Sequence, residues 1–405
     1  MRKLKAFLTF AIFIQSAEPV WAGGIYTFRS TVDFVAAADD NPSVNGLGIV
    51  PNQAKNFKLV YGLYPSIFMN YKAPRVDFQL SYALGVNRVG RSELDLDSES
   101  QAFEGNVNAA LTQNLKMRFS DTYIRSPDFI TFNLFRGTTV SPEGLFPRSD
   151  IAALRTDSQA NTASVSFDYT FNPKSALSFA LGQFIRNYEK KPVVSVHLSD
   201  QTASNGSLLY VRRINQRTSW NLGYSLYQYN FRDFDGARTH NADIGISHQM
   251  SKSLSASLSA GPAYTESLKG NSKFPGYNAS LSITKSFEND RISLTYHRRS
   301  GSSFGIGSIS DTQDLGVYYF LLLGRRTTLN SAVSLYNARQ RLDNPVASRG
   351  VAASLALNLI LNSHWALNLG GSYQKQKGTD IFDVERRRIF VSIRFILPEF
   401  LRFEK

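Results

Sequence analysis

An alternation of apolar and polar residues with a period of two runs along nearly all of this chain. In the segment from Arg388 to Phe395 every odd-numbered residue is apolar, whereas three of the four even-numbered residues are arginine or serine. Successive side chains of a β-strand point to opposite faces, so each such segment predicts a strand with one apolar and one polar face. A chain of 405 residues written in this period predicts a transmembrane antiparallel up-and-down β-barrel, apolar outside and polar in its lumen.

The first residues follow a different pattern. A basic start at residues 2–5 and an apolar run from Ala6 to Ile14 are followed by the small-residue pattern Val20-Trp21-Ala22. This order predicts a signal peptide over residues 1–22. The apolar run is too short to span a bilayer as a helix. Residues 23–405 show no Pro/Gly/Ser-rich linker or charge block, so we expect them to form one domain, the outer-membrane β-barrel.

The composition narrows the classes of protein. Cysteine is absent, which excludes disulfides, thiolate metal sites and a catalytic cysteine. The mean hydropathy is −0.22, and after the N-terminal segment the chain has no stretch of about 18 apolar residues. These features exclude a helical membrane protein and fit a barrel whose lipid face alternates with a wet one.

Tight turns and longer links alternate along the chain. Turn residues such as Asn172-Pro173-Lys174 separate the two strands of each predicted hairpin, and longer links, such as residues 300–311, separate the hairpins. Short turns of outer-membrane barrels face the periplasm and long loops face outward. An opening strand near Tyr26–Val35 and a closing strand near Arg387–Ile396 give about 18 strands, or about 16 if the first hairpin stays outside the wall. A soluble sandwich, solenoid or propeller is the alternative, but the long, one-sided strands favour a membrane barrel.

Aromatic residues near the strand ends predict an interfacial girdle. Trp220 and Trp365 each open a strand after a predicted periplasmic turn. The aromatic residues expected at the opposite strand ends are Tyr188, Tyr229, Phe231, Tyr264, Tyr296 and Tyr373.

Three segments resemble a known family. They are Pro74–Tyr82 (PRVDFQLSY), Phe119–Phe129 (FSDTYIRSPDF) and Phe167–Lys174 (FDYTFNPK). They resemble the β-barrel porin type 2 family of bacterial outer-membrane proteins, whose members often accompany loci for exopolysaccharide synthesis and export. The resemblance implies an outer-membrane barrel and, through that association, polysaccharide export components as partners.

The predicted lumen leads to a functional expectation. A barrel of about 18 strands is wide enough for an aqueous channel, which predicts passive diffusion of solutes, with polysaccharide or oligosaccharide export as the finer hypothesis. The alternative is a non-conducting structural or accessory barrel of an envelope export complex. The charged residues predicted to line the pore are Lys58, Arg75, Asp77, Lys116, Arg118, Asp168, Arg186, Arg212, Asp243, Arg388 and Arg394.

The longest predicted link, residues 127–158, is rich in aromatic and charged residues. One hypothesis is that this loop folds inward and narrows the pore. The other is that it packs across the outer mouth of the barrel. The candidate constriction residues are Phe132, Phe135, Arg136, Glu143, Arg148 and Asp150.

The net charge of +13 suggests attraction of anions. The residues predicted to face inward are only mildly basic in sum, however, and much of the excess falls in predicted outer loops and rims, as at Arg88, Lys190 and Lys377. We expect these bases to contact outer-membrane lipid and lipopolysaccharide phosphates; attraction of an acidic polymer and a solubilising role without a partner are the alternatives. The barrel-assembly machinery is a further expected partner.

Catalytic chemistry has little support in the sequence. The five histidines show no paired spacing, and no metal quartet, glycine-rich phosphate loop or nucleotide fingerprint occurs. We therefore predict that the protein is not an enzyme, holds no metal or cofactor, and binds no nucleic acid.

Overall fold

The structure, a computed structural model, describes residues 24–40, 57–89, 98–126, 158–188, 199–270, 272–303, 308–340, 347–378, 384–397 and 402–404. Within these ranges, no helix is long and apolar enough to cross a membrane. The strands are β1 (Ile25–Asp39), β2 (Lys58–Lys72), β3 (Val76–Val89), β4 (Ser98–Ala110), β5 (Leu115–Ser126), β6 (Ser158–Asn172), β7 (Ser175–Tyr188), β8 (Gln201–Arg213), β9 (Thr218–Phe231), β10 (Ala237–Gln249), β11 (Leu254–Ser267), β12 (Lys273–Ser286), β13 (Asp290–Ser303), β14 (Ser308–Leu322), β15 (Thr327–Gln340), β16 (Ala347–Ile360), β17 (Trp365–Gly378), β18 (Val384–Ile396) and β19 (Arg402–Glu404).

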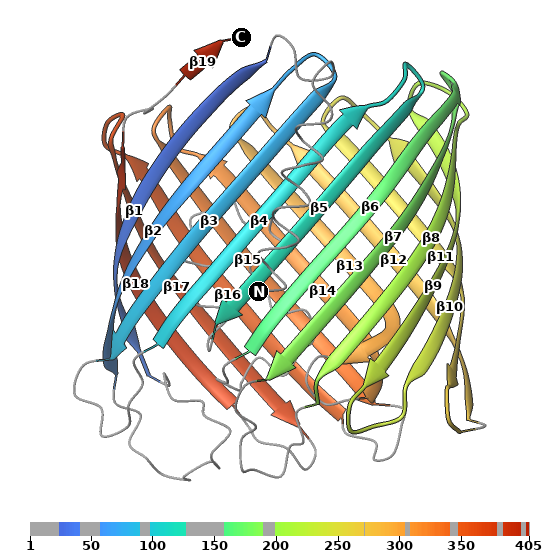
Figure 1. The fold of residues 1–405 in the computed structure, drawn as a ribbon. Helices are drawn as coiled ribbons and strands as arrows, with labels where there is room; N and C mark the ends of the chain where they lie inside the picture. Colours follow the sequence, from blue (N-terminus) through green and yellow to red (C-terminus); the bar gives the residue numbers. More distant parts are fainter. Residues whose placement is uncertain are drawn as a thin grey trace, which may run out of the picture.

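Strands β1–β18 form one closed antiparallel wall, in which each strand pairs with its sequence neighbours (Figure 1). Closure is made by β1, which pairs with β2 along its whole length and with β18 from Thr31 to Asp39. The short strand β19 pairs with the first residues of β1. The first hairpin therefore belongs to the wall, which confirms the count of 18 and excludes the count of 16. Pairing thus runs around the whole circumference of the barrel, as hydrocarbon requires.

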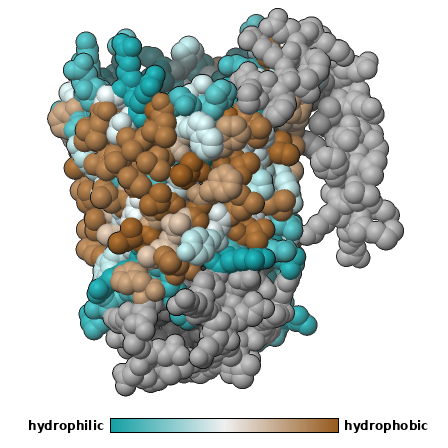
Figure 2. Space-filling view, turned by 90° about the vertical axis from the view of Figure 1, so that its left-hand side faces the viewer, coloured by the Kyte–Doolittle hydropathy of each residue, from teal (hydrophilic) through white to brown (hydrophobic). Residues whose placement is uncertain are grey.

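The alternation in the sequence separates the two faces of the wall. On β18 the odd-numbered residues face outward, where Ile389 is 63% exposed, and the even-numbered Arg388 and Ser392 are buried. Exposed apolar side chains cover the outer wall as a broad brown band, with hydrophilic residues above and below it (Figure 2). An exposed apolar band of this kind is stable only against acyl chains.

The aromatic girdle is confirmed in part. Trp220 and Trp365 lie on the outer face at the tight-turn end, together with Tyr210 and Phe395 respectively. Tyr264, Tyr296 and Tyr373 also lie in outward register at the opposite end. In contrast, the register places Tyr188, Tyr229 and Phe231 on the inner face, so their assignment to the girdle was wrong. The strand phase, not the position at a strand end, decides which aromatic residue meets lipid.

The tight turns are built from short polar side chains. The Oδ1 of Asn362 accepts hydrogen bonds from the backbone N–H groups of His364 (2.8 Å) and Trp365 (2.9 Å), which closes the turn before β17. Asn215 does the same for Arg217 and Thr218 before β9. Asparagine favours such turns because its side chain replaces a backbone acceptor.

Candidate functional site in the barrel lumen

Hydroxyl groups facing one another across neighbouring strands line much of the inner wall. Ser280, Ser282 and Thr284 of β12 lie on this face. The hydroxyl of Ser280 is 2.7 Å from that of Ser259, and the hydroxyl of Thr284 is 3.0 Å from that of Ser293. Similar pairs join β5 to β6 (Ser120 and Ser164, 2.8 Å) and β10 to β11 (Thr239 and Thr265, 3.0 Å). The alternating pattern therefore builds a wall of small polar groups.

The lumen differs between its two ends. In the half near the long links, inward residues from most strands are buried. The larger ones are Asp39, Tyr64, Asn87, Gln201, Tyr229, Phe231, Thr239, Thr265, Tyr336, Gln376, Arg388 and Phe390. In the half near the tight turns, inward residues are accessible to water, and the Arg118 side chain is 60% exposed. Among the described residues, the inner face is therefore more accessible to water at the tight-turn end than in the half near the long links.

An ion-pair cluster closes the inner face of the seam between β1 and β18. The buried carboxylate of Asp39 accepts hydrogen bonds from two guanidinium groups, that of Arg388 (2.6 Å) and that of Arg386 (2.7 Å). Asp39 and Arg388 are directly opposite each other in the register. Charge-assisted bonds of this kind are short and directional, so they fix the register at which the barrel closes.

A second ion pair lies six residues further along the same seam. The Nε of Arg394 donates to the Oδ1 of Asp33 over 2.7 Å, and these residues are again direct partners across the strands. Strand phase predicted that Arg388 and Arg394 face the lumen, but Asp33 and Asp39 were missed. They lie beside Val35 and Ala37, which are apolar and also face inward, so the alternation that identifies inward residues is lost in β1.

A third group of charges lies in the water-accessible half, on β5 and β6. The guanidinium of Arg118 is 2.8 Å from the carboxylate of Asp168, which also accepts a hydrogen bond from Ser178 (2.6 Å). Lys116 is the direct partner of Asp168 in the register. The structure thus brings together three of the predicted pore-lining residues.

Other predicted pore-lining residues also lie on the inner face, at scattered positions. Lys58 is opposite Asp39 in the register, and Asp77 is opposite Lys72 near the tight-turn end. Arg186 lies beside Tyr188, with its guanidinium 5.8 Å from the ring centroid.

Asp243 also faces inward, on β10. Its carboxylate oxygens lie 2.9 Å from where a Cβ on Gly223 would stand. Gly223 is the direct partner of Asp243 on β9, so the absence of a side chain there leaves room for the carboxylate.

Two predictions require correction. Arg212 is paired with Trp220 and Ser175 on the outer face, and its neighbour Arg213 faces inward instead. The segment around it is apolar at both parities, with Leu208 and Leu209 adjacent, so the phase of β8 is ambiguous in the sequence. Arg75 lies in the exposed turn between β2 and β3 and not within a strand.

The end of the β13–β14 hairpin bends into the lumen. Pairing between β12 and β13 stops at Ala279 and Arg298, whereas β13 and β14 remain paired to Ser303 and Ser308. Beyond that point, Ile309 of β14 is fully buried in a cluster with three inward-facing residues of β9 and β10, which are Tyr229, Phe231 and Ala237. In the wall, β11 and β12 lie between β10 and β13, so the contact of Ile309 with β9 and β10 crosses the inside of the barrel. Figure 1 shows the end of this hairpin, in orange, as a curved segment. Residues 300–311 were predicted to be a loop, and this part of the hairpin was not anticipated.

The structure does not test the prediction that the loop over residues 127–158 narrows the pore. Its candidate residues Phe132, Phe135, Arg136, Glu143, Arg148 and Asp150 lie outside the described residues.

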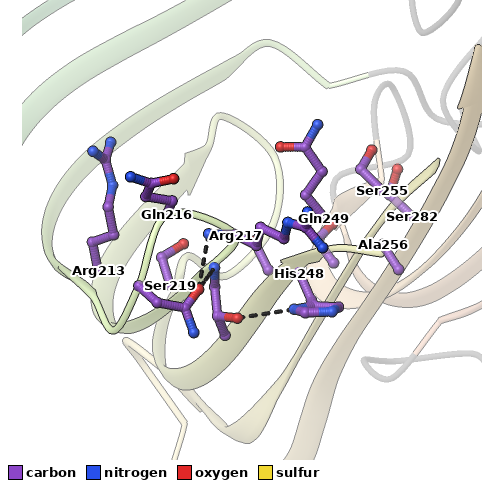
Figure 3. Close-up of a pocket in the computed structure, with 13 residues that line it drawn as sticks. Arg213, Gln216, Arg217, Ser219, His248, Gln249, Ser255, Ala256 and Ser282 are labelled. Atoms are coloured by element: carbon purple, nitrogen blue, oxygen red, sulfur yellow. Dashed lines mark hydrogen bonds between the residues drawn. The ribbon is translucent and has the colours of Figure 1, made fainter. Parts of the chain in front are cut away.

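A polar cavity of about 530 Å³ opens at the tight-turn end of β8–β12 (Figure 3). Arg213 and Gln216 lie at one end of it, and Ser255 and Ser282 at the other. A row of inward residues in direct register, Arg213, Ser219, Ser247, Ser257 and Ser282, forms its wall. Its lining contains no carboxylate, and the described part of the chain offers no side-chain partner for Arg213 or Arg217. The cavity therefore combines positive charge with hydroxyl groups.

The geometry of wall and lumen defines the class of protein. A closed barrel of 18 antiparallel strands with an apolar outer band and a polar inner face is an outer-membrane β-barrel. Within the described residues, no group of three or more His, Asp or Glu side chains is placed to hold a metal ion.

The comparison with solved structures finds chains of similar fold at low sequence identity. OccK2 (OpdF) of Pseudomonas aeruginosa is 11% identical, with a TM-score of 0.49 over 93% of this chain and 98% of that one. OccAB4 of Acinetobacter baumannii is 11% identical, with a TM-score of 0.48 over 93% and 99% of the two chains. OpdK of Pseudomonas aeruginosa is 10% identical, with a TM-score of 0.46 over 91% and 99%. Likeness at this level does not indicate a shared substrate.

The sequence comparisons find no relative. No protein-family model matches the chain, and no curated protein matches it. The resemblance to the β-barrel porin type 2 family therefore stays a prediction.

Proposed function

We propose that this protein is a passive diffusion channel for small hydrophilic solutes, with a preference for anions at its periplasmic mouth. The observation that carries the proposal is the cavity at the tight-turn end, which is polar, water-accessible and lined by arginine and serine without a carboxylate. A barrel of 18 strands has room for an aqueous path. Fixed positive charge within low-dielectric walls concentrates anions at such an entrance.

The ion pairs elsewhere in the lumen favour a mild rather than a strong preference for anions over cations. Asp33, Asp39 and Asp168 each neutralise an inward arginine, so these bases attract solute less than an unpaired base does. The unpaired bases of the cavity then set the selectivity. Conductance in planar bilayers, with a reversal potential measured under a KCl gradient, tests the proposal.

Neighbouring residues of β8 offer a matched pair of variants. Arg213→Gln removes a base from the lumen, whereas Arg212→Gln removes one from the outer face. We expect Arg213→Gln to shift the reversal potential toward cation selectivity and Arg212→Gln to leave it unchanged. An equal response of both variants would refute the role of the cavity. Absence of any conductance would support the alternative, a non-conducting accessory barrel.

Passage of oligosaccharides is a second candidate, which the rows of inward hydroxyls favour. Serine and threonine exchange hydrogen bonds with sugar hydroxyls, and the inward aromatic residues Phe184, Tyr318 and Phe320 offer apolar faces for sugar rings. Export of a polysaccharide, with export components as partners, is the finest version of this candidate. Swelling of proteoliposomes in neutral sugars of increasing size tests passage, and block of the ion current by an acidic oligosaccharide tests the polymer version.

A further inference from the structure

The outer wall carries an unusual set of bases at the end opposite the tight turns, on β15–β17. Arg349 of β16 and Lys377 of β17 are direct partners on the outward face. Like charges directly opposite each other across strands destabilise a sheet. Arg339 of β15 and Lys375 of β17 lie one diagonal step from Arg349 on the same face. Four bases thus cover three adjacent strands.

These four bases, Arg339, Arg349, Lys375 and Lys377, have no carboxylate partner among the described residues. The one acid in register with them, Glu385 opposite Lys375, is engaged by Arg387 at 2.6 Å. Two bases elsewhere on the same rim do have a carboxylate partner: Arg238 lies 3.6 Å from Glu266, and Arg298 lies 3.8 Å from Asp311. The four bases, which we name the rim cluster, are therefore a local excess of positive charge.

The wall adjoining the rim cluster on the membrane side is apolar. Leu335 of β15 is 52% exposed and Leu355 of β16 is 51% exposed, and Val391 of β18 continues the apolar surface. This surface is part of the exposed apolar band that faces acyl chains. A ligand that complements both the rim cluster and this apolar wall has at least two anionic groups, for the bases, and several acyl chains, which lie along the strands.

We propose that the rim cluster binds the phosphorylated glucosamine headgroup of lipid A in the outer leaflet. The long links of an outer-membrane barrel face outward, which places the cluster at the level of that headgroup. Guanidinium and ammonium groups form short charge-assisted bonds to phosphate oxygens, and a phosphate between Arg349 and Lys377 relieves their mutual repulsion. This proposal is independent of whether the barrel conducts.

Native mass spectrometry of the detergent-solubilised full chain tests the proposal with three lipid probes. We expect bis-phosphorylated lipid A to bind the wild-type protein at least 10-fold more tightly than either mono-phosphorylated lipid A or phosphatidylglycerol. Equal binding of the three lipids would overturn it. These comparisons need no variant, so they are unaffected by any folding defect.

Two variants then locate the site. The triple variant Arg339→Gln/Arg349→Gln/Lys377→Gln should lose at least 10-fold in affinity for bis-phosphorylated lipid A. The control Arg238→Gln removes a rim base that is already paired, and it should retain wild-type affinity. Retention of affinity by the triple variant, or an equal loss in the control, would contradict the assignment to the rim cluster.

Discussion

Removal of the Asp39 carboxylate is expected to be the most damaging single substitution at the barrel seam. Asp39 is fully buried, and it compensates Arg388, whose side chain is 4% exposed, and Arg386, whose side chain is 13% exposed. Asp39→Ala leaves both guanidinium groups in a site with little water. Deleting one partner of a buried ion pair costs about 3–5 kcal/mol, because the remaining charge is left uncompensated.

The same chain provides an internal control for this magnitude. Asp168→Ala removes the partner of Arg118, a contact of nearly equal length, 2.8 Å, in which the arginine is 60% exposed. Water solvates the freed guanidinium, so the expected loss is about 0–1 kcal/mol. The two variants differ in burial and in the number of arginines that they leave without the carboxylate, two at Asp39 and one at Asp168, and both differences act in the same direction.

Reversible unfolding in guanidinium chloride, in lipid vesicles, gives the free energy of unfolding from the linear dependence on denaturant. Fluorescence of Trp220 and Trp365, which lie on the outer face, reports the transition. We expect Asp39→Ala to lower the free energy of unfolding by about 3 kcal/mol more than Asp168→Ala does. The double variant Asp39→Ala/Arg388→Ala should recover part of that free energy. Equal losses for the two single variants would refute the reasoning that buried charge at the seam governs closure.

Three further predictions concern the two faces of the wall, the bent β13–β14 hairpin and the β14–β15 turn. Leu355→Arg, on the lipid face, should lower the free energy of unfolding by up to about 2–4 kcal/mol, the value for an arginine at mid-membrane. Ser354→Arg, on the inner face, should lower it far less, and unfolding in vesicles compares the two variants. Ile309→Ala should loosen the hairpin end and raise the single-channel conductance, and an unchanged conductance would place the narrow zone elsewhere. Gly324→Ala should destabilise the β14–β15 turn by about 1 kcal/mol or more, because Gly324 has φ of +84°, and a neutral result in the unfolding assay would contradict this.

The wall was predictable because it depends on local pattern. The period of two placed Arg388 and Arg394 inside and Ile389 outside, and the structure confirms each position. Where a segment is apolar at both parities, as at Leu208 and Leu209, the pattern gives no phase, which explains the error at Arg212.

The contents of the lumen were less predictable, because they depend on contacts between distant segments. Nothing near Ile309 in the sequence indicates that it packs on Tyr229 and Phe231, which lie some 80 residues earlier. The same holds for the partners of Asp39, which come from the other end of the chain. Such contacts follow from barrel closure and from a bend whose causes are tertiary.

The early end of the β12–β13 ladder has a consequence for the surrounding lipid. Only the residues from Ala279 to Ser286 pair with β13, and eight residues at about 3.3 Å each and a tilt of roughly 40° span about 20 Å along the membrane normal. The apolar band of such barrels is about 25 Å tall, so hydrocarbon beside β12 and β13 must be shallower than elsewhere around the perimeter. Bilayer thickness at this one side of the protein is thus set by where the hairpin leaves the wall.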